Sequence, residues 1–215
     1  SYQPRPWTLP ALPLTLYPKS NSRYCSLPGF EIDTETLPTS AIMTQPIHMP
    51  SDQDLKHLLE LNQQALPHVN DVSLEEMAWF TRNCAYFRAL SDDSGPLGFL
   101  GAMDPACDYS SLNFRWFKER YPSFIYIDRI VVSDRARRMG VATRLYSDLA
   151  DFALGMAPLL ACEVNLRPAN PVSLRFHESL GFREVGQQDT EGGKKTVCLM
   201  VKELGNGSSP TLDQT

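Results

Sequence analysis

The sequence lacks the features that mark metal-binding, membrane-spanning or secreted proteins. Its five cysteines form no C-x-x-C pair and no cluster with the spacing of zinc ligands. This odd, scattered set indicates free thiols in a reducing compartment. No apolar run approaches the roughly 20 residues that span a bilayer, and no charged segment followed by an apolar one resembles a secretory signal. We therefore expect a cytoplasmic protein with no metal site and no membrane partner.

Basic residues are too few and too scattered for nucleic-acid binding. The 215 residues hold 20 Lys and Arg against 25 Asp and Glu, which gives a formal net charge of -5. Binding a phosphate backbone needs clustered basic side chains that replace condensed counterions, so we expect no nucleic-acid partner. A mildly acidic surface would not repel an amine. The absence of a G-x-S-x-G sequence removes the usual sign of a Ser-His-Asp hydrolase.

Composition divides the chain into three segments. Residues 1–42 hold seven of the seventeen prolines and no acidic residue before Glu31, which predicts an extended or disordered arm because proline removes a donor. An original start at Met43 and a targeting segment are alternatives for this arm. Residues 43–204 are long enough for one domain with one core. The Gly/Ser-rich residues 205–215 are expected to form a flexible tail.

Hydrophobic periodicity predicts an α/β layout, with helices on a mixed sheet, in the order β α α β β β α β α β β. An aromatic-rich excursion, Tyr109–Tyr121, interrupts the series, and Ser51 is the expected N-cap of the first helix. The expected elements are Ile47–Met49, Asp52–Ala65, Ser73–Cys84, Ala85–Leu90, Leu97–Met103, Phe124–Val132, Met139–Gly155, Leu159–Leu166, Asn170–Leu180, Phe182–Gln188 and Lys194–Glu203.

A short loop with a glycine joins the strand Phe124–Val132 to the following helix, an arrangement typical of an anion site. Main-chain amides at a helix N-terminus lack internal partners, and the helix dipole favours negative charge there. Gly140 would let the backbone approach a phosphate closely, and the small Ala142 would keep the opening clear. Three arginines add positive charge: Arg135, Arg137 and Arg138. Taken alone, the pattern R-x-x-G-x-A also fits a solvated basic turn before an ordinary helix.

A second motif lies at the helix Asn170–Leu180. Asn170 suits the N-cap, Pro171 the first helical position and Gly181 the residue that ends the helix. Helical spacing predicts two faces. One face carries the polar residues Asn170, Ser173 and His177. The other, expected to face the core, carries Val172, Phe176 and Leu180.

Together the two motifs resemble the GNAT superfamily of acyl-CoA N-acyltransferases. Its pyrophosphate motif, (Arg/Gln)-x-x-Gly-x-(Gly/Ala), is matched by Arg137, Gly140 and Ala142. Its helix motif is matched by Asn170, Ser173, Phe176, Gly181 and Phe182. The resemblance is close to a group of bacterial acetyltransferases of unknown substrate that carry Asp-Arg-Ile-Val-Val and Cys-Glu-Val-Asn strands. It leaves residues 1–42 outside.

The resemblance implies a mixed, mostly antiparallel sheet, flanked by helices, whose parallel central strands splay apart. It implies that the pantetheine arm of acetyl-CoA binds in this gap as an added strand would, and that a strand amide polarises the thioester carbonyl. Dimers are common in the family, so a homodimer is one possible state. The residues expected to bind acetyl-CoA are Ile130, Val131, Val132, Arg137, Arg138, Met139, Gly140, Val141, Ala142, Thr143, Asn165, Asn170 and Ser173.

The implied activity is transfer of the acetyl group of acetyl-CoA to a primary amine of a small molecule or peptide, by direct attack in a ternary complex. Holding both substrates together supplies much of the acceleration. The family usually places a tyrosine, which protonates the departing thiolate, at the position of His177. His177 is therefore a candidate acid, or a packed residue that fills this space. The missing tyrosine also leaves open a non-catalytic acyl-CoA-binding regulatory module, and the glycine loop a protein that binds another phosphate ligand.

Two acidic residues interrupt otherwise apolar strands and are candidates for taking the proton of the amine: Asp128 and Glu163. An acid in such a strand is costly unless it is paired or faces a wet cleft. Asp128 is preferred, because the family often places a carboxylate in that strand. Salt bridges with Arg129 or Arg167, and desolvation of the amine without a dedicated base, are the alternatives. Four aromatics are expected either in the acceptor pocket or on a buried helix face: Tyr109, Phe114, Trp116 and Phe117.

Overall fold

The structure, a computed structural model, describes residue 42 and residues 44–205. The predicted arm and tail, residues 1–42 and 205–215, therefore lie outside the described residues except for Ile42 and Gly205, and the division of the chain into segments stays a prediction. Ile42 is buried in the core, and its carbonyl accepts a hydrogen bond of 2.6 Å from Arg144.

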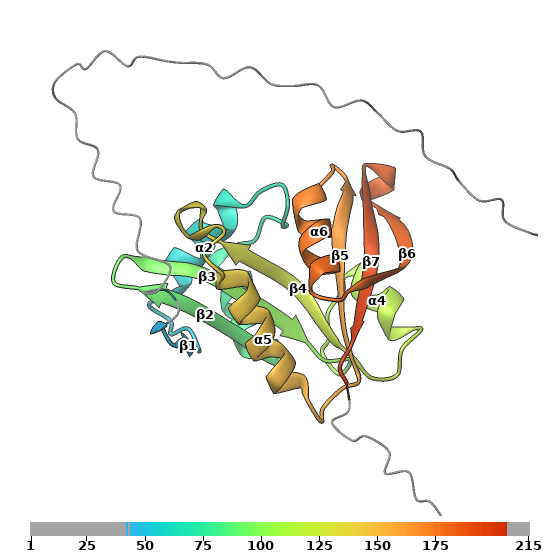
Figure 1. Cartoon of the computed structure of the whole chain (residues 1–215). Helices are drawn as coiled ribbons and strands as arrows, with labels where there is room; N and C mark the ends of the chain where they lie inside the picture. Colours follow the sequence, from blue (N-terminus) through green and yellow to red (C-terminus); the bar gives the residue numbers. More distant parts are fainter. Residues whose placement is uncertain (1–41, 43, 206–215) are drawn as a thin grey trace, which may run out of the picture. The chain divides into compact units, whose positions relative to one another are not determined.

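The described residues form a seven-stranded sheet in the order β1-β2-β3-β4-β5-β7-β6 (Figure 1). The strands are β1 (Ile47–His48), β2 (Tyr86–Asp92), β3 (Gly95–Met103), β4 (Ile125–Val132), β5 (Leu159–Arg167), β6 (Arg183–Thr190) and β7 (Lys195–Glu203). The helices are α2 (Leu55–Gln64), α3 (Leu74–Asn83), α4 (Leu112–Lys118), α5 (Val141–Ala153) and α6 (Pro171–Ser179), with the 3-10 turns η1 (Asp134–Ala136) and η2 (Glu191–Gly193).

One parallel pair stands at the centre of an otherwise antiparallel sheet. The pairing of β4 with β5 is limited to three residues of each strand, Ile125–Ile127 and Leu160–Cys162. Every other neighbouring pair of strands is antiparallel. Beyond these residues the two strands separate, as Figure 1 shows. This confirms the predicted fold class, a mixed and mostly antiparallel sheet with splayed parallel central strands flanked by helices.

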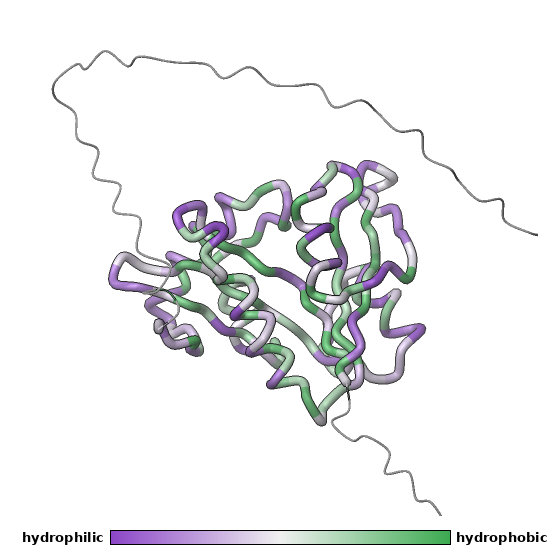
Figure 2. The backbone as a smooth tube through the Cα atoms, viewed as in Figure 1, coloured by the Kyte–Doolittle hydropathy of each residue, from purple (hydrophilic) through white to green (hydrophobic). Residues whose placement is uncertain are grey.

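Helices cover both faces of the sheet, and each face has its own apolar core. α5 buries Val141, Leu145 and Leu149, one residue per helical turn, against one face. α2, α3 and α4 contribute apolar side chains to the core on the other face. The hydropathy of the chain follows this layering, because apolar segments run through the central strands and polar segments lie in the turns (Figure 2).

Two local expectations are wrong in detail. The first helix begins at Leu55, not Asp52, and Ser51 is not its N-cap. The Asp54 carboxylate accepts hydrogen bonds of 2.7 Å from both the amide and the hydroxyl of Ser51, which holds these residues in a turn. The next helix does start as expected, with a reciprocal capping box between Ser73 and Glu76.

The expected faces of α6 also need correction. Val172 was expected in the core but is 70% exposed, whereas His177, expected on the polar face, is only 3% exposed. Its imidazole turns inward because it finds two partners there, the Tyr146 hydroxyl and the Ser173 carbonyl. Phe176 and Leu180 are partly buried against the core.

The aromatic excursion contains the short helix α4, which Ser111 caps. Phe114 and Phe117 are fully buried in the core. Trp116 packs on β6, where a Cβ atom added to Gly186 would lie 2.9 Å from its ring. These aromatics therefore pin α4 to the sheet, and only Tyr109 of the four candidates lines a cavity.

Among residue 42 and residues 44–205, no helix combines the length and the apolar character that crossing a membrane requires.

Candidate functional site

Two carboxylates follow directly on the last paired residues of the parallel strands. Pairing ends at Ile127 and Cys162, so Asp128 and Glu163 are the first side chains beyond the separation. β4 also carries a bulge there, because Arg129 and Ile127 pair with consecutive residues of β3 and leave Asp128 without a partner. A bulge re-aims the side chains beside it.

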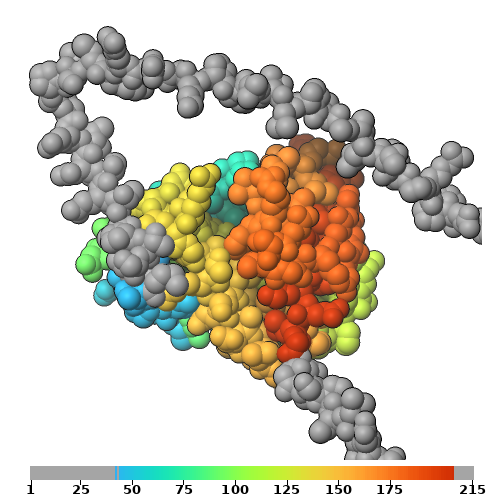
Figure 3. Space-filling view, in the orientation of Figure 1, coloured from blue at the N-terminus to red at the C-terminus, as the bar shows by residue number. Residues whose placement is uncertain are grey.

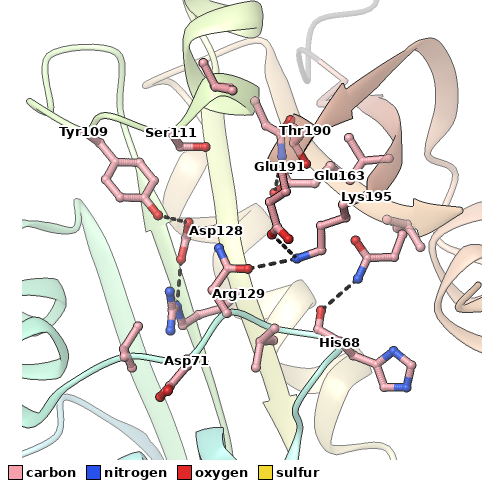
Figure 4. A pocket seen from close by; sticks show the side chains of 18 of the residues that line it. His68, Asp71, Tyr109, Ser111, Asp128, Arg129, Glu163, Thr190, Glu191 and Lys195 are labelled. Atoms are coloured by element: carbon pink, nitrogen blue, oxygen red, sulfur yellow. Dashed lines mark hydrogen bonds and ion pairs between the residues drawn. The ribbon is translucent and has the colours of Figure 1, made fainter. Parts of the chain in front are cut away.

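Both carboxylates line a cavity of about 430 Å³, a size in the range of small-molecule sites. The cavity lies between the α2–α3 loop, the start of α4, the separating strands and the β6–β7 connection (Figure 4). Figure 3 shows a hollow between the end of β4 and α6, with the α2–α3 region behind it. The sequence-predicted residues that line the cavity are Asp128, Glu163, Asn165, Asn170 and Ser173.

Glu163 carries a partly buried carboxyl group with two donors. The Tyr126 hydroxyl donates to its Oε2 at 2.7 Å, and the Asn113 side-chain amide donates to its Oε1 at 3.0 Å. Burial disfavours the ionised form and raises the pKa of Glu163 to about 7, although both hydrogen bonds oppose the shift. A carboxyl group in this state can take or give a proton near neutral pH.

Asp128 is held differently, in a buried ion pair. Its Oδ2 accepts from Nε of Arg129 at 2.7 Å, and its Oδ1 accepts from the Tyr109 hydroxyl at 2.6 Å (Figure 4). Arg129 also donates to Asn62 at 3.0 Å and lies 4.1 Å from the centre of the Phe80 ring. Both oxygens of Asp128 thus have a partner, and the expected salt bridge between Asp128 and an arginine is present.

His177 lies in the protein interior and does not line the cavity. Its Nδ1 is 2.8 Å from the Ser173 carbonyl oxygen, so this nitrogen carries the proton, and Nε2 accepts from the Tyr146 hydroxyl at 2.6 Å. Burial lowers the pKa of His177, which favours the neutral ring. The structure gives His177 no contact with the cavity, and its role as a proton donor stays a prediction.

The loop before α5 presents main-chain amides that point to an anion. Gly140 caps the helix in the left-handed region with φ 83°. Within the described residues, the amides of Gly140, Val141, Ala142 and Thr143 have no backbone or side-chain acceptor, whereas the Met139 amide bonds to the Ala136 carbonyl at 3.3 Å. Four free amides at the positive end of a helix fit a phosphate group.

The three arginines near this loop differ in their partners. Arg135 is committed to the β2–β3 turn, since it donates to both carboxylate oxygens of Asp92. Arg137 forms an exposed ion pair with Asp134 at 2.8 Å. Arg138, which adopts φ 64°, has no ion pair in the part of the chain that the structure describes. It is the arginine of this loop most available to an anionic ligand.

Sequence reasoning missed two residues that contact Glu163. Tyr126 belongs to a run of apolar strand residues, and Asn113 lies among the aromatics of α4, so neither carried a polar signal of its own. The Tyr126 contact follows from the pairing of β4 with β5, and the Asn113 contact from the position of α4. Nowhere in residue 42 or residues 44–205 do three His, Cys, Asp or Glu side chains group so that they could hold a metal ion.

Comparison with known proteins identifies the same fold in solved enzymes. The ribosomal-protein-S18-alanine N-acetyltransferase of Escherichia coli is 18% identical, with a TM-score of 0.57, over 80% of this chain and 99% of its own. Arabidopsis thaliana NAA60, crystallised with a bisubstrate analogue, is 18% identical, with a TM-score of 0.61, over 77% and 100%. A phosphinothricin acetyltransferase of Sinorhizobium meliloti in complex with AcCoA is 24% identical, with a TM-score of 0.56, over 80% and 95%.

A search of curated proteins gave no match. The profile described as "Acetyltransferase (GNAT) family" matches residues 55–182, which run from the start of α2 to the end of the α6 motif. The matched range includes the glycine loop, Asp128 and Glu163. The chain therefore belongs to the acetyltransferase (GNAT) family.

Proposed function

We propose that this acetyltransferase moves the acetyl group of acetyl-CoA to a primary amine by direct attack in a ternary complex, and that Glu163 accepts the proton of the amine. The observation that carries the proposal is the position of Glu163. It is a partly buried carboxyl group with a pKa of about 7, at the point where the parallel strands separate and beside a cavity.

The donor side of the site has features that fit acetyl-CoA, the cosubstrate of the family. The free amides from Gly140 to Thr143 would hold its diphosphate, and Arg138 would add a charge. The backbone of Ile130–Val132 borders the gap left by β5 and would hold the pantetheine arm. When bound, acetyl-CoA supplies an activated acyl group as a thioester. Asn165, Asn170 and Ser173 line the cavity and would lie near the acetyl end.

Glu163 is preferred over Asp128 as the proton acceptor because of their partners. Asp128 is neutralised by Arg129 inside the protein, and accepting a proton would break that pair and leave a buried cation uncompensated. Glu163 has only neutral donors, from Tyr126 and Asn113. Protonation of Glu163 therefore leaves no buried ion without its partner, and Glu163 can take the proton directly or through a water molecule.

The charges of the cavity support an amine as acceptor. Five carboxyl groups line it, from Asp71, Glu76, Asp128, Glu163 and Glu191. The cations on its wall are Arg129, paired with Asp128, and Lys195, which lies 3.6 Å from Glu191. The excess of carboxylates would attract a protonated amine. The Escherichia coli neighbour is by name an N-acetyltransferase, which supports nitrogen as the acceptor atom.

The test is a steady-state assay with acetyl-CoA and a panel of primary amines, in which free CoA thiol and the mass of the N-acetyl product are both measured. Varying both substrates should give intersecting double-reciprocal lines, as a ternary complex requires. Parallel lines would indicate a covalent acetyl-enzyme and contradict direct attack. Binding of acetyl-CoA without turnover of any amine would instead support the regulatory module.

A further inference from the structure

A chain of hydrogen bonds runs from the edge of the sheet to Glu163. The side chain of Gln188, on β6, donates from its Nε2 to Oδ1 of Asn113 at 2.9 Å. Asn113, in the first turn of α4, donates from its Nδ2 to Oε1 of Glu163 at 3.0 Å. Three segments far apart in the sequence thus converge on one carboxyl group.

The order of donors and acceptors in this chain has a direction. Because Gln188 gives its hydrogen to the Asn113 carbonyl oxygen, the Asn113 amide must turn its NH₂ toward Glu163. The opposite orientation of Asn113 would place its NH₂ against the NH₂ of Gln188 and its oxygen against the Glu163 carboxylate. Gln188 therefore selects the orientation in which Asn113 is a donor.

We propose that Asn113 and Gln188 are positioning residues for Glu163: Asn113 orients the proton-accepting carboxyl group, and Gln188 holds Asn113 in its donating orientation. This inference rests on the proposed function, because it concerns the group assigned there as the base. It gives α4 a role in the site: the aromatic residues of α4 anchor the helix to the sheet, and the side-chain amide of Asn113 reaches Glu163.

The chain of hydrogen bonds from Gln188 through Asn113 to Glu163, called the relay below, opposes the effect of burial on the pKa of Glu163. A donor to a carboxylate favours its ionised form, so loss of the Asn113 donor should raise the pKa of Glu163, and reversal of its amide should raise it further. The Tyr126 hydroxyl acts in the same direction on the other oxygen. The titratable and charged groups around the same cavity are His68, Asp71, Glu76, Tyr109, Tyr126, Asp128, Arg129, Glu191 and Lys195.

The decisive variant is Gln188→Glu, which keeps size and shape but replaces the donor with an acceptor. The new carboxylate would accept from the Asn113 NH₂ and turn the Asn113 oxygen toward Glu163. Asn113→Leu removes the donor altogether. For Asn113→Leu we expect the ascending limb of the pH profile of kcat/KM to move up by about one pH unit, the effect of one hydrogen bond to a charged group. For Gln188→Glu we expect a larger shift in the same direction. The affinity for acetyl-CoA should stay unchanged.

The matched control is Gln187→Leu, the neighbouring strand residue, whose side chain is exposed and bonds only to Glu184 at 2.9 Å. It should leave the profile in place. If Glu163→Gln suppresses turnover but Asn113→Leu and Gln188→Glu keep the parent profile, the relay is wrong and the base assignment stands. If Glu163→Gln itself leaves turnover and profile unchanged, the base assignment falls and the relay with it.

Discussion

Tyr126 and Glu163 meet across the last paired stretch of β4 and β5, where the Tyr126 hydroxyl donates to the Glu163 carboxyl group at 2.7 Å. Both residues point to the α4 side of the sheet, where Tyr126 is fully buried and Glu163 is partly buried. The contact holds a carboxyl group at the edge of the cavity that separation of the strands opens. Because this donor is neutral, whereas Asp128 is paired with the Arg129 cation, the two acids differ in chemistry.

Glu163→Gln should lower kcat/KM by about 10²- to 10⁴-fold, the usual contribution of a general base, and should spare acetyl-CoA affinity. The amide fits the same space, with its oxygen facing Asn113 and its NH₂ facing Tyr126. Initial rates and calorimetric titration with acetyl-CoA measure the two effects. A loss of less than threefold would leave desolvation of the amine, without a dedicated base, as the better account.

Asp128→Asn should act mainly on stability. It leaves the buried guanidinium of Arg129 without a counter-charge, and breaking a buried ion pair by removing one partner costs about 3 to 5 kcal/mol. Urea denaturation should therefore rank Asp128→Asn well below both the parent protein and Glu163→Gln. If the two acid variants are equally stable, Asp128 is not structurally paired as described.

The stability of the protein should depend on the ionisation of Glu163. Burial raises the folded-state pKa of Glu163 from an ordinary value of 4.5 to about 7. Between these two pH values the folded state therefore holds a proton that the unfolded state has lost. Stability from this group is complete below pH 4.5 and is lost as the pH rises through 7. Glu163→Gln should therefore gain about 3 kcal/mol relative to the parent between pH 4.5 and pH 8. Denaturation curves with a constant difference across this range would contradict the assignment.

Gly140→Val should weaken acetyl-CoA binding by at least about tenfold, because a β-branched residue resists the left-handed conformation that presents the loop amides. Gly155→Val is the matched control. Gly155 has φ 80° just beyond the other end of α5, and a side chain there meets open space. Both variants should lose similar stability, and only Gly140→Val should lose affinity in calorimetry. Equal affinities would contradict the phosphate assignment.

The predictable part of the fold came from patterns that depend on neighbouring residues. The capping box at Ser73, the helical stripe of α5 and the loop at Gly140 are local, so the sequence carries them in full. The site was predictable only as isolated acids in apolar strands. Asp128 pairs with the adjacent Arg129, but the side chains that hold this pair, Asn62 and Tyr109, come from distant elements. The donors to Glu163 come from α4 and β4. Periodicity also misplaced His177, since it assigns polar side chains to the surface and cannot see the Tyr146 hydroxyl.

His177→Phe should reveal whether this residue positions α6 or donates a proton. Its burial against Tyr146 favours positioning: the variant should lose about 1 to 3 kcal/mol, because the buried Tyr146 hydroxyl loses its acceptor. Adding Tyr146→Phe should recover much of that loss, a coupling that a double-mutant cycle measures. Turnover should fall less than tenfold, with an unchanged pH profile. A drop of a hundredfold or more, with loss of the alkaline limb, would restore His177 as the acid.

The acceptor should carry positive rather than negative charge away from its reacting amine. Asp71 and Glu76 line the cavity, and within the described residues each accepts only from a neutral donor, Gln63 or Ser73. A second cation on the acceptor would therefore find carboxylates without an ion pair there. Three acceptors of equal chain length test this: 1,4-diaminobutane, 4-aminobutanol and 4-aminobutanoate. We expect kcat/KM to fall in that order, with about a tenfold step for each change of charge, which corresponds to about 1.4 kcal/mol per charge contact. Asp71→Asn should shrink the preference for the diamine, whereas Asp151→Asn, an exposed acid on α5 outside the cavity, should not. A preference for the aminobutanoate would mean that Lys195 or Arg129 leaves its partner to bind the acceptor, and that the paired cations, not the excess carboxylates, set specificity.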